Sequence, residues 1–270
     1  MLNRYLFFPL LLLLAAGWQS CSKTPDSGDT AEPYVLSYGD SILYMKPVAG
    51  DYIVHPLHTR PGTYNGFPDG IEIDETTGAI NVTKSETGLR YRISHISLSG
   101  DTTETLVVLS GITFRDRFYN LSAGDSVARP VYNASELRQV PLPGSLFDEG
   151  NIANTEGCTV NPEDGSINLS ASLRQGIFGP SPRNDDQKTV EIQYRINDAS
   201  GKSKNKLKVL LYWYNSMADV PDYLWEILND RTTQGVFLRG SNQNGSHTAT
   251  DARTAKVAKP RPPCVVIVDH

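Results

Sequence analysis

Histidine and cysteine, which often carry catalysis or bind metals, are sparse in this chain and mostly lie far apart. Only His55 and His58 stand close together, with Pro56 between them, and no second group has the spacing of a zinc site. We expect this pair to face solvent in a loop, and we expect no metal site. The histidines are His55, His58, His95, His247 and His270.

Sequence motifs of nucleophilic catalysis, zinc proteolysis and phosphate binding are absent: there is no Gly-x-Ser-x-Gly, no His-Glu-x-x-His and no phosphate loop. The adjacent carboxylates Asp185 and Asp186 lie in a turn-rich stretch, which favours a solvated turn. Glycosidase acid and base residues could still converge in space, because their sequence spacing is unconstrained. We predict that the chain is not an enzyme and takes no cofactor, with an envelope carbohydrate-active enzyme as the alternative.

Cys21 has the most distinctive setting of any reactive side chain. Arg4 precedes an apolar run over residues 5–17, which has signal-peptide length but is too short for a convincing membrane-spanning helix. Cys21 follows Ser20 just after this run, and residues 22–33 are polar and rich in turn-forming types. A processed chain would therefore begin near Cys21.

This arrangement resembles a bacterial lipoprotein signal, in which the cysteine, here Cys21, is acylated and becomes the first residue. The resemblance implies a signal peptide over residues 1–20, a flexible tether over 21–33 and a lipid that holds the protein at the cell envelope. Ser22 favours the outer membrane by analogy with enterobacterial sorting, with the protein periplasmic or surface-exposed. Trp18 stands where such signals usually have Leu, so ordinary signal-peptide cleavage slightly upstream is the alternative.

Composition indicates a folded chain with room for two domains. The 270 residues can hold two domains of about 100 residues each after the signal and tether. A formal net charge of -5 argues against nucleic-acid binding. Besides Cys21 there are only Cys158 and Cys264, which could form a disulfide in an oxidising compartment or remain two buried thiols.

The chain contains an internal repeat. Three short landmarks recur in the same order, and only the spacing between the last two is longer in the second half. This difference predicts an inserted loop over residues 176–188. The matched segments are Tyr38–Ile42 with Ala123–Val127, Thr77–Asn81 with Asp164–Asn168, and Tyr91–Ile93 with Tyr194–Ile196.

Each half has the pattern of short β-strands joined by tight turns. No amphipathic helix separates the strands, which favours antiparallel pairing between neighbours. The sequence therefore predicts an all-β fold of two tandem Ig-like antiparallel β-sandwiches, at residues 34–115 and 116–216. Alternating or continuous apolar runs occur at 90–96, 106–109, 191–196 and 207–211.

Residues 67–80 place an apolar strand before Asp74, then Thr77 and Gly78, then Ile80 at the start of the next strand. This spacing resembles a pattern shared by bacterial Ig-like and cadherin-like domains. Its physical basis is a tight turn, in which the aspartate bonds to the backbone and the glycine adopts a positive φ. The second half matches more loosely, and the resemblance implies a fold, not an activity.

Cadherin domains bind calcium between domains through Leu-Asp-Arg-Glu and Asp-x-Asn-Asp-Asn segments, and neither segment occurs here. The region between the two halves has Asp116 flanked by Arg115 and Arg117. One carboxylate between two guanidiniums is a poor site for a hard cation that needs several oxygen ligands. We predict no calcium between the domains.

Aromatic residues concentrate at the end of the second half and form the candidate ligand-binding surface. Exposed flat rings can bind sugars or peptides. The alternative is that Trp213 packs inward, Tyr212 and Tyr214 face outward, and a short helix over residues 222–230 caps the sandwich through Leu224, Trp225 and Leu228. The candidates are Tyr212, Trp213, Tyr214, Tyr223 and Trp225.

The last segment, residues 217–270, combines the helix with a basic tail and an apolar end. Residues 231–261 hold six Lys or Arg against one Asp and predict a weakly ordered tail, which could bind anionic glycans or lipid head groups or simply be a solvated linker. The apolar run over 263–268 would promote aggregation if exposed. We expect it to join a sheet, of this protein in preference to a partner.

Together these patterns predict a membrane-anchored lipoprotein of the cell envelope. We expect it to serve as a binding or adhesion module for a glycan or an envelope protein. A purely structural spacer is a further alternative.

Overall fold

The computed structural model describes residues 33–238 and 262–270. Residues Val35–His270 form one compact unit, distinct from residues 1–34. The predicted signal peptide, Cys21 and most of the predicted basic tail lie outside the described residues. The described chain consists mainly of β-strands with few helices, which confirms the predicted fold class.

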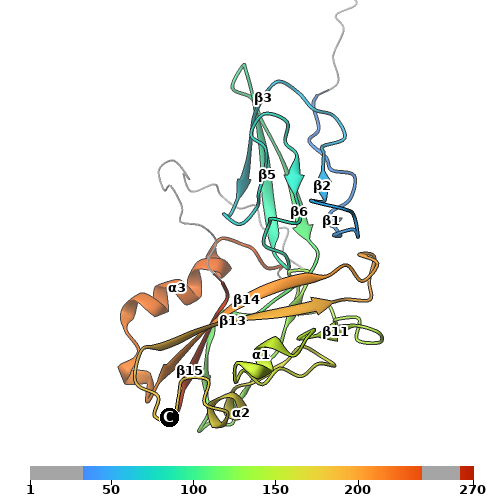
Figure 1. The fold of residues 1–270 in the computed structure, drawn as a ribbon. Coiled ribbons are helices and arrows are strands. Elements are labelled where there is room, and N and C mark those ends of the chain that lie inside the picture. Colours follow the sequence, from blue (N-terminus) through green and yellow to red (C-terminus); the bar gives the residue numbers. More distant parts are fainter. Residues whose placement is uncertain (1–32, 239–261) are drawn as a thin grey trace, which may run out of the picture. The chain divides into compact units, whose positions relative to one another are not determined.

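The first sandwich consists of a four-stranded sheet and a two-stranded sheet (Figure 1). Alternation along its longest strands puts Tyr91, Ile93 and His95 in the interior. In sheet order the strands are β1 (Ile42–Leu43), β6 (Thr102–Leu109), β5 (Arg90–Ser97) and β3 (Gly62–Phe67), with β2 (Ile53–Val54) paired to β4 (Ile80–Asn81).

The second sandwich is built on a five-stranded sheet, with two short strand pairs beside it. In sheet order its strands are β11 (Leu146–Phe147), β13 (Asp186–Arg195), β14 (Asn205–Tyr214), β15 (Cys264–Val268) and β8 (Arg117–Asn120). The short pairs are β9 (Val127–Ala128) with β12 (Ile167–Asn168), and β7 (Ile112–Thr113) with β10 (Val131–Tyr132).

Four helices accompany the strands in the described part of the chain. The helix predicted over residues 222–230 is present and continues to Thr233. Two helices inside the second sandwich were not predicted, because each is shorter than two full turns and shows no usable periodicity. The helices are α1 (Ile152–Thr155), α2 (Leu169–Arg174), η1 (Met217–Asp219) and α3 (Asp222–Thr233).

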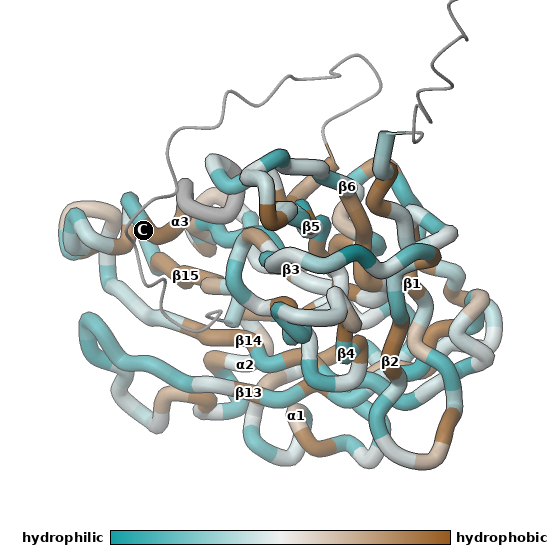
Figure 2. The backbone as a smooth tube through the Cα atoms, turned by 90° about the horizontal axis from the view of Figure 1, so that it is seen from above, coloured by the Kyte–Doolittle hydropathy of each residue, from teal (hydrophilic) through white to brown (hydrophobic). Residues whose placement is uncertain are grey.

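The five-stranded sheet packs against other elements on both faces over the part formed by β15 and the end of β14. One face packs into a large core with Phe147, Ile192 and Val209, and the other packs against α3 through Leu224 and Leu228. Within the described residues, no helix combines the length and apolarity needed to cross a bilayer. The apolar run of β15 lies beside β14 in this sheet (Figure 2).

Strand β15 confirms the prediction that the apolar run over 263–268 joins a sheet of this protein. It does not add to an edge: it lies between β14 and β8 and runs parallel to both. The first sandwich also has a parallel pair, β1 with β6. Strands that are distant in sequence can enter a sheet in either direction, whereas the neighbours β13 and β14 are joined by a short turn and must be antiparallel.

The second landmark of the repeat forms the same turn in both sandwiches. Asp74 accepts backbone N–H groups of Thr76 and Thr77 at 3.0 and 2.7 Å, and Gly78 has a φ of +72°. In the second copy, Asn161 plays the aspartate's role and Gly165 has a φ of +74°. The turn mechanism inferred from the sequence is confirmed.

The first landmark is not equivalent in the two copies. Ile42 lies in β1, which pairs parallel with β6, whereas Val127 lies in β9, which pairs antiparallel with β12. A short match such as Gly-Asp-Ser marks a turn of the same kind, and a turn can precede different strands.

The predicted tail begins in an ordered segment. Val236 and Phe237 are buried, the carbonyl of Val236 accepts the backbone N–H of Arg90 at 2.9 Å, and the guanidinium of Arg115 lies over the Phe237 ring. Residues 234–238 are therefore part of the fold, and the prediction of weak order from residue 231 was wrong for them. Residues 239–261 lie outside the described part.

Candidate functional site

The aromatic residues of β14 do not form an exposed platform. Trp213 packs into the large core, and Tyr212 and Tyr214 pack on the opposite face beneath α3. The inward position of Trp213 agrees with the alternative interpretation, but the outward tyrosines are covered as well, because α3 packs on this end of the sheet. The candidate assignment of Tyr212, Trp213 and Tyr214 as a contact surface is therefore corrected.

The two aromatic residues of α3 do reach the surface. Tyr223 is 44% exposed and Trp225 is 42% exposed, whereas Leu224 and Leu228 are buried. The Trp225 ring packs on Phe118, with ring centroids 4.2 Å apart. Tyr223 instead points its hydroxyl to Asp185, at 3.3 Å from Oδ1. The rings of Tyr223 and Trp225 therefore contact different parts of the protein.

Asp185 joins the inserted loop to the sheet and to α3. Its Oδ1 accepts hydrogen bonds from the hydroxyl of Tyr214 at 2.7 Å and from that of Tyr223 at 3.3 Å. Its own backbone N–H donates to the carbonyl of Trp213, and its φ of +69° is left-handed. Aspartate is one of the few side chains that accept this conformation readily.

Both tyrosines are harder to ionise than a free tyrosine. Burial raises the pKa of Tyr214, and the carboxylate of Asp185 raises it further. Burial likewise raises the pKa of Tyr223. Both hydroxyls therefore stay protonated near neutral pH and serve as donors to Asp185.

The residue before Asp185 is hydrogen-bonded to the segment that follows β14, which in turn is hydrogen-bonded to His270. Oδ1 of Asn184 accepts the backbone N–H of Asn215 at 2.8 Å, and the backbone N–H of His270 donates to the carbonyl of Asn215 at 3.1 Å. These side chains are exposed. We call this group the Asp185 cluster: Asn184, Asp185, Tyr214, Asn215, Tyr223 and His270.

The Asp185 cluster gathers three parts that the first sandwich lacks. Asn184 and Asp185 come from the inserted loop, Tyr223 comes from α3, and His270 follows β15. The cluster offers groups that are suited to binding a ligand: an acceptor carboxylate, side-chain amides and a partly exposed phenol ring. Such groups match the hydroxyls and the apolar faces of sugar rings.

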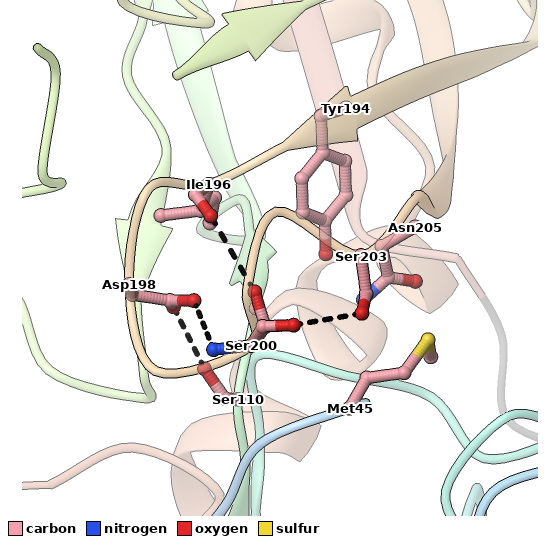
Figure 3. A pocket seen from close by; sticks show the side chains of 9 residues that line it. Met45, Ser110, Tyr194, Ile196, Asp198, Ser200, Ser203 and Asn205 are labelled. Carbon is pink, nitrogen blue, oxygen red and sulfur yellow. Dashed lines mark hydrogen bonds between the residues drawn. The ribbon is translucent and has the colours of Figure 1, made fainter. Parts of the chain in front are cut away.

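A second candidate is a small hollow beside Asp198 (Figure 3). It has a volume of about 10 Å³, which suits a single water molecule. Asp198 accepts hydrogen bonds from the hydroxyls of Tyr132 at 2.7 Å and Ser110 at 3.3 Å, and from the backbone N–H of Ser200 at 2.8 Å. Burial and the Asp198 carboxylate raise the pKa of Tyr132.

The hollow is a structural junction. Ser110 follows β6 of the first sandwich, whereas Asp198 and Ser200 belong to the turn between β13 and β14. The donors that reach Asp198 are hydroxyls and an amide. These hydrogen bonds satisfy the carboxylate of Asp198 and hold it at the junction.

Metal ligands do not gather in the described residues, where no group of three or more His, Cys, Asp or Glu side chains could hold an ion. His55 and His58 are both exposed. Asp116, in the region considered for calcium, instead accepts the backbone N–H of Cys264 through Oδ1 at 2.6 Å. That carboxylate therefore fixes the beginning of β15.

Cys158 and Cys264 are both buried and no disulfide joins them, so the disulfide considered from the sequence is not formed. Cys158 lies in the large core, whereas Cys264 lies on the α3 side of the sheet. The sheet itself separates them. Burial raises the pKa of the Cys158 thiol to about 12.

Comparisons with known proteins give little. No family model matches the chain, and no curated protein matches it. Among solved structures, mouse clustered PcdhgC3 EC1-3 is similar over 66% of this chain and 67% of that chain, with 11% identity and a TM-score of 0.18. A likeness this low carries no inference about ligand or activity.

Sequence reasoning identified Tyr223 as a candidate but interpreted Asp185 as an ordinary solvated turn residue. The available signal was the insertion itself, because a loop present in one repeat only is a common place for function. Asp198 gave no signal, since its partners Ser110 and Tyr132 are distant in sequence. Cys21 lies outside the described residues.

Proposed function

We propose that this chain is an exported, lipid-anchored module of the cell envelope that binds a glycan through the Asp185 cluster. Cys21 serves as the acylated residue. The apolar run before it and the polar stretch after it support this role. Two or more acyl chains hold a protein stably on a membrane surface. Ser22 favours the outer membrane.

The observation that carries the binding function is the contact between Asp185 and Tyr223. One carboxylate oxygen accepts hydrogen bonds from two tyrosine hydroxyls, and Tyr223 remains 44% exposed beside it. A sugar hydroxyl can donate to the carboxylate while the C–H face of the ring packs on the phenol. The left-handed backbone at Asp185 holds the carboxylate in place before the ligand arrives.

In this function the chain binds its ligand and does not catalyse a reaction. Hydroxyls and amides are the donors that reach Asp185 and Asp198, which makes both carboxylates acceptors in a fixed framework. Hydrolysis of a glycosidic bond needs two carboxyl groups on either side of the bond.

The binding function is tested with a glycan array, followed by calorimetric titration with the glycans retained. We expect Tyr223→Ala to weaken binding about tenfold or more, which corresponds to roughly 1.4 kcal/mol. Trp225→Ala is the matched control, because Trp225 lies on the same helix and is similarly exposed, at 42%. Equal losses in both variants, or no glycan retained, would contradict the proposal.

The anchor is tested by metabolic labelling with a fatty-acid analogue. The wild-type chain should incorporate the label and Cys21→Ser should not. Fractionation of the labelled protein with the outer rather than the inner membrane tests the location. Equal labelling of both forms would overturn the assignment of Cys21.

A further inference from the structure

The five-stranded sheet has a strand that the first sandwich does without. In the first sandwich, the hairpin β5–β6 is followed at the sheet edge by β1, which pairs directly with β6. In the second, the hairpin β13–β14 is followed by β15, and only then by β8. Strand β15 therefore takes the place beside the hairpin that β1 takes in the first sandwich, and it fills the gap between β14 and β8.

The gap accepts only an apolar strand. All five residues of β15 are buried. Val265 and Ile267 enter the large core, and Cys264, Val266 and Val268 face α3. A strand with the usual alternation of apolar and polar residues would bury polar side chains on one of these faces.

The backbone of β15 is paired along both edges. On one side Val266 lies opposite Tyr212, and on the other it lies opposite Phe118. At its beginning the N–H of Cys264 donates to Asp116, and beyond its end the N–H of Asp269 donates to the carbonyl of Tyr214. Every one of these contacts is open to an identical strand from another molecule.

The chain is long enough to make such an exchange. Residues 239–261 separate the two described parts, which amounts to 23 residues. Fully extended, this number of residues spans roughly 80 Å. A strand on this connection can therefore reach the gap of a neighbouring copy.

We propose that the gap between β14 and β8 also accepts β15 of a second copy of this chain, which gives strand-exchanged dimers and longer chains of molecules. An exchanged strand makes the same contacts as the chain's own strand, so concentration and kinetics decide between them. The chain's own strand dominates in dilute solution. At high concentration a neighbour's strand competes, because pairing over long sequence separations is slow.

The test uses a disulfide that reports which molecule supplies the strand. Leu210 lies opposite Cys264 and packs on the same face, so Leu210→Cys places a thiol beside the native one. The matched control is the double variant Ile42→Cys with Val108→Cys, which links the parallel pair β1–β6. Both full-length chains also carry Cys21→Ser, which removes that thiol whether or not it is acylated.

Each chain is unfolded under reduction, refolded by dilution to micromolar or near-millimolar concentration, oxidised and run on a denaturing gel without reductant. We expect covalent dimers and larger species from Leu210→Cys, in a fraction that rises with concentration, and monomers from the control. Only monomers from Leu210→Cys at both concentrations would overturn the proposal.

A second measurement needs no substitution. The mass of the wild-type protein in solution is determined after the same refolding, and then after dilution. Oligomers that form at high concentration and persist on dilution are expected, and a monomer throughout would contradict exchange. Neither result depends on glycan binding or on acylation of Cys21.

Discussion

The hydroxyl of Tyr194 lies 3.0 Å from Oγ1 of Thr87 and joins the end of β13 to the loop that precedes β5. The same hydroxyl accepts the backbone N–H of Ile112 at 3.2 Å, and Nδ2 of Asn205 donates to Thr87 at 3.1 Å. Tyr194 is 1% exposed. This buried network connects residues that the sequence assigns to two separate sandwiches.

Replacing Tyr194 with Phe should destabilise the protein by roughly 1–3 kcal/mol, because the buried N–H of Ile112 loses its acceptor. The measurement is urea unfolding followed by tryptophan fluorescence. Tyr91→Phe is the control from the matching repeat position, where the hydroxyl donates to the carbonyl of Glu86 at 2.8 Å. If Tyr194→Phe loses no more free energy of unfolding than Tyr91→Phe, the predicted role of the Tyr194 hydroxyl is contradicted.

Stability should fall in alkaline solution. Burial raises the pKa of Tyr194 from 10.0 to about 12. The folded state thus holds its proton more tightly than the unfolded state, so the stabilisation is complete below about pH 10 and is lost as pH rises towards 12. Burial has the same effect on Tyr119, whose pKa also rises to about 12.

The pH dependence is checked by measuring the free energy of unfolding at several values across that window. Tyr194→Phe should show a shallower decline than the wild-type protein, because one titrating group has been removed. Parallel curves for the two proteins would show that Tyr194 does not contribute.

Gly165→Ala should destabilise the second sandwich through two separate effects. The φ of +74° costs a residue with a side chain roughly 1–3 kcal/mol, and the added Cβ would lie 2.7 Å from the Phe147 ring. Gly124→Ala is the matched control, since its φ is +79° but nothing lies within 4 Å of the added atom. In thermal unfolding, Gly165→Ala should have a clearly lower melting temperature than Gly124→Ala.

Asp116→Ala should weaken the attachment of β15 at its beginning. The carboxylate accepts the N–H of Cys264 at 2.6 Å, and loss of a hydrogen bond to a charged acceptor costs about 1.5–3 kcal/mol. Asp116→Asn keeps an oxygen acceptor and should lose less. Hydrogen exchange of the β15 amides reports the effect locally, and unchanged exchange in Asp116→Ala would contradict it.

Interactions between residues that are close in sequence were sufficient to predict many elements of this fold. The turn at Asp74 and Gly78, the alternation in β5 and the helix beginning at Asp222 all follow from neighbouring residues. The apolar run at the chain end was recognised as a sheet strand because its composition leaves no other soluble place for it.

Tertiary structure alone decided where those elements went. Three features depend on partners far along the chain. Strand β15 pairs parallel with β14 and β8, α3 covers Tyr212 and Tyr214, and the sheet separates Cys158 from Cys264. The same holds for Asp185, whose tyrosine partners come from β14 and α3. Sequence periodicity records which face of an element is apolar, but only the packing of all the elements determines what covers that face.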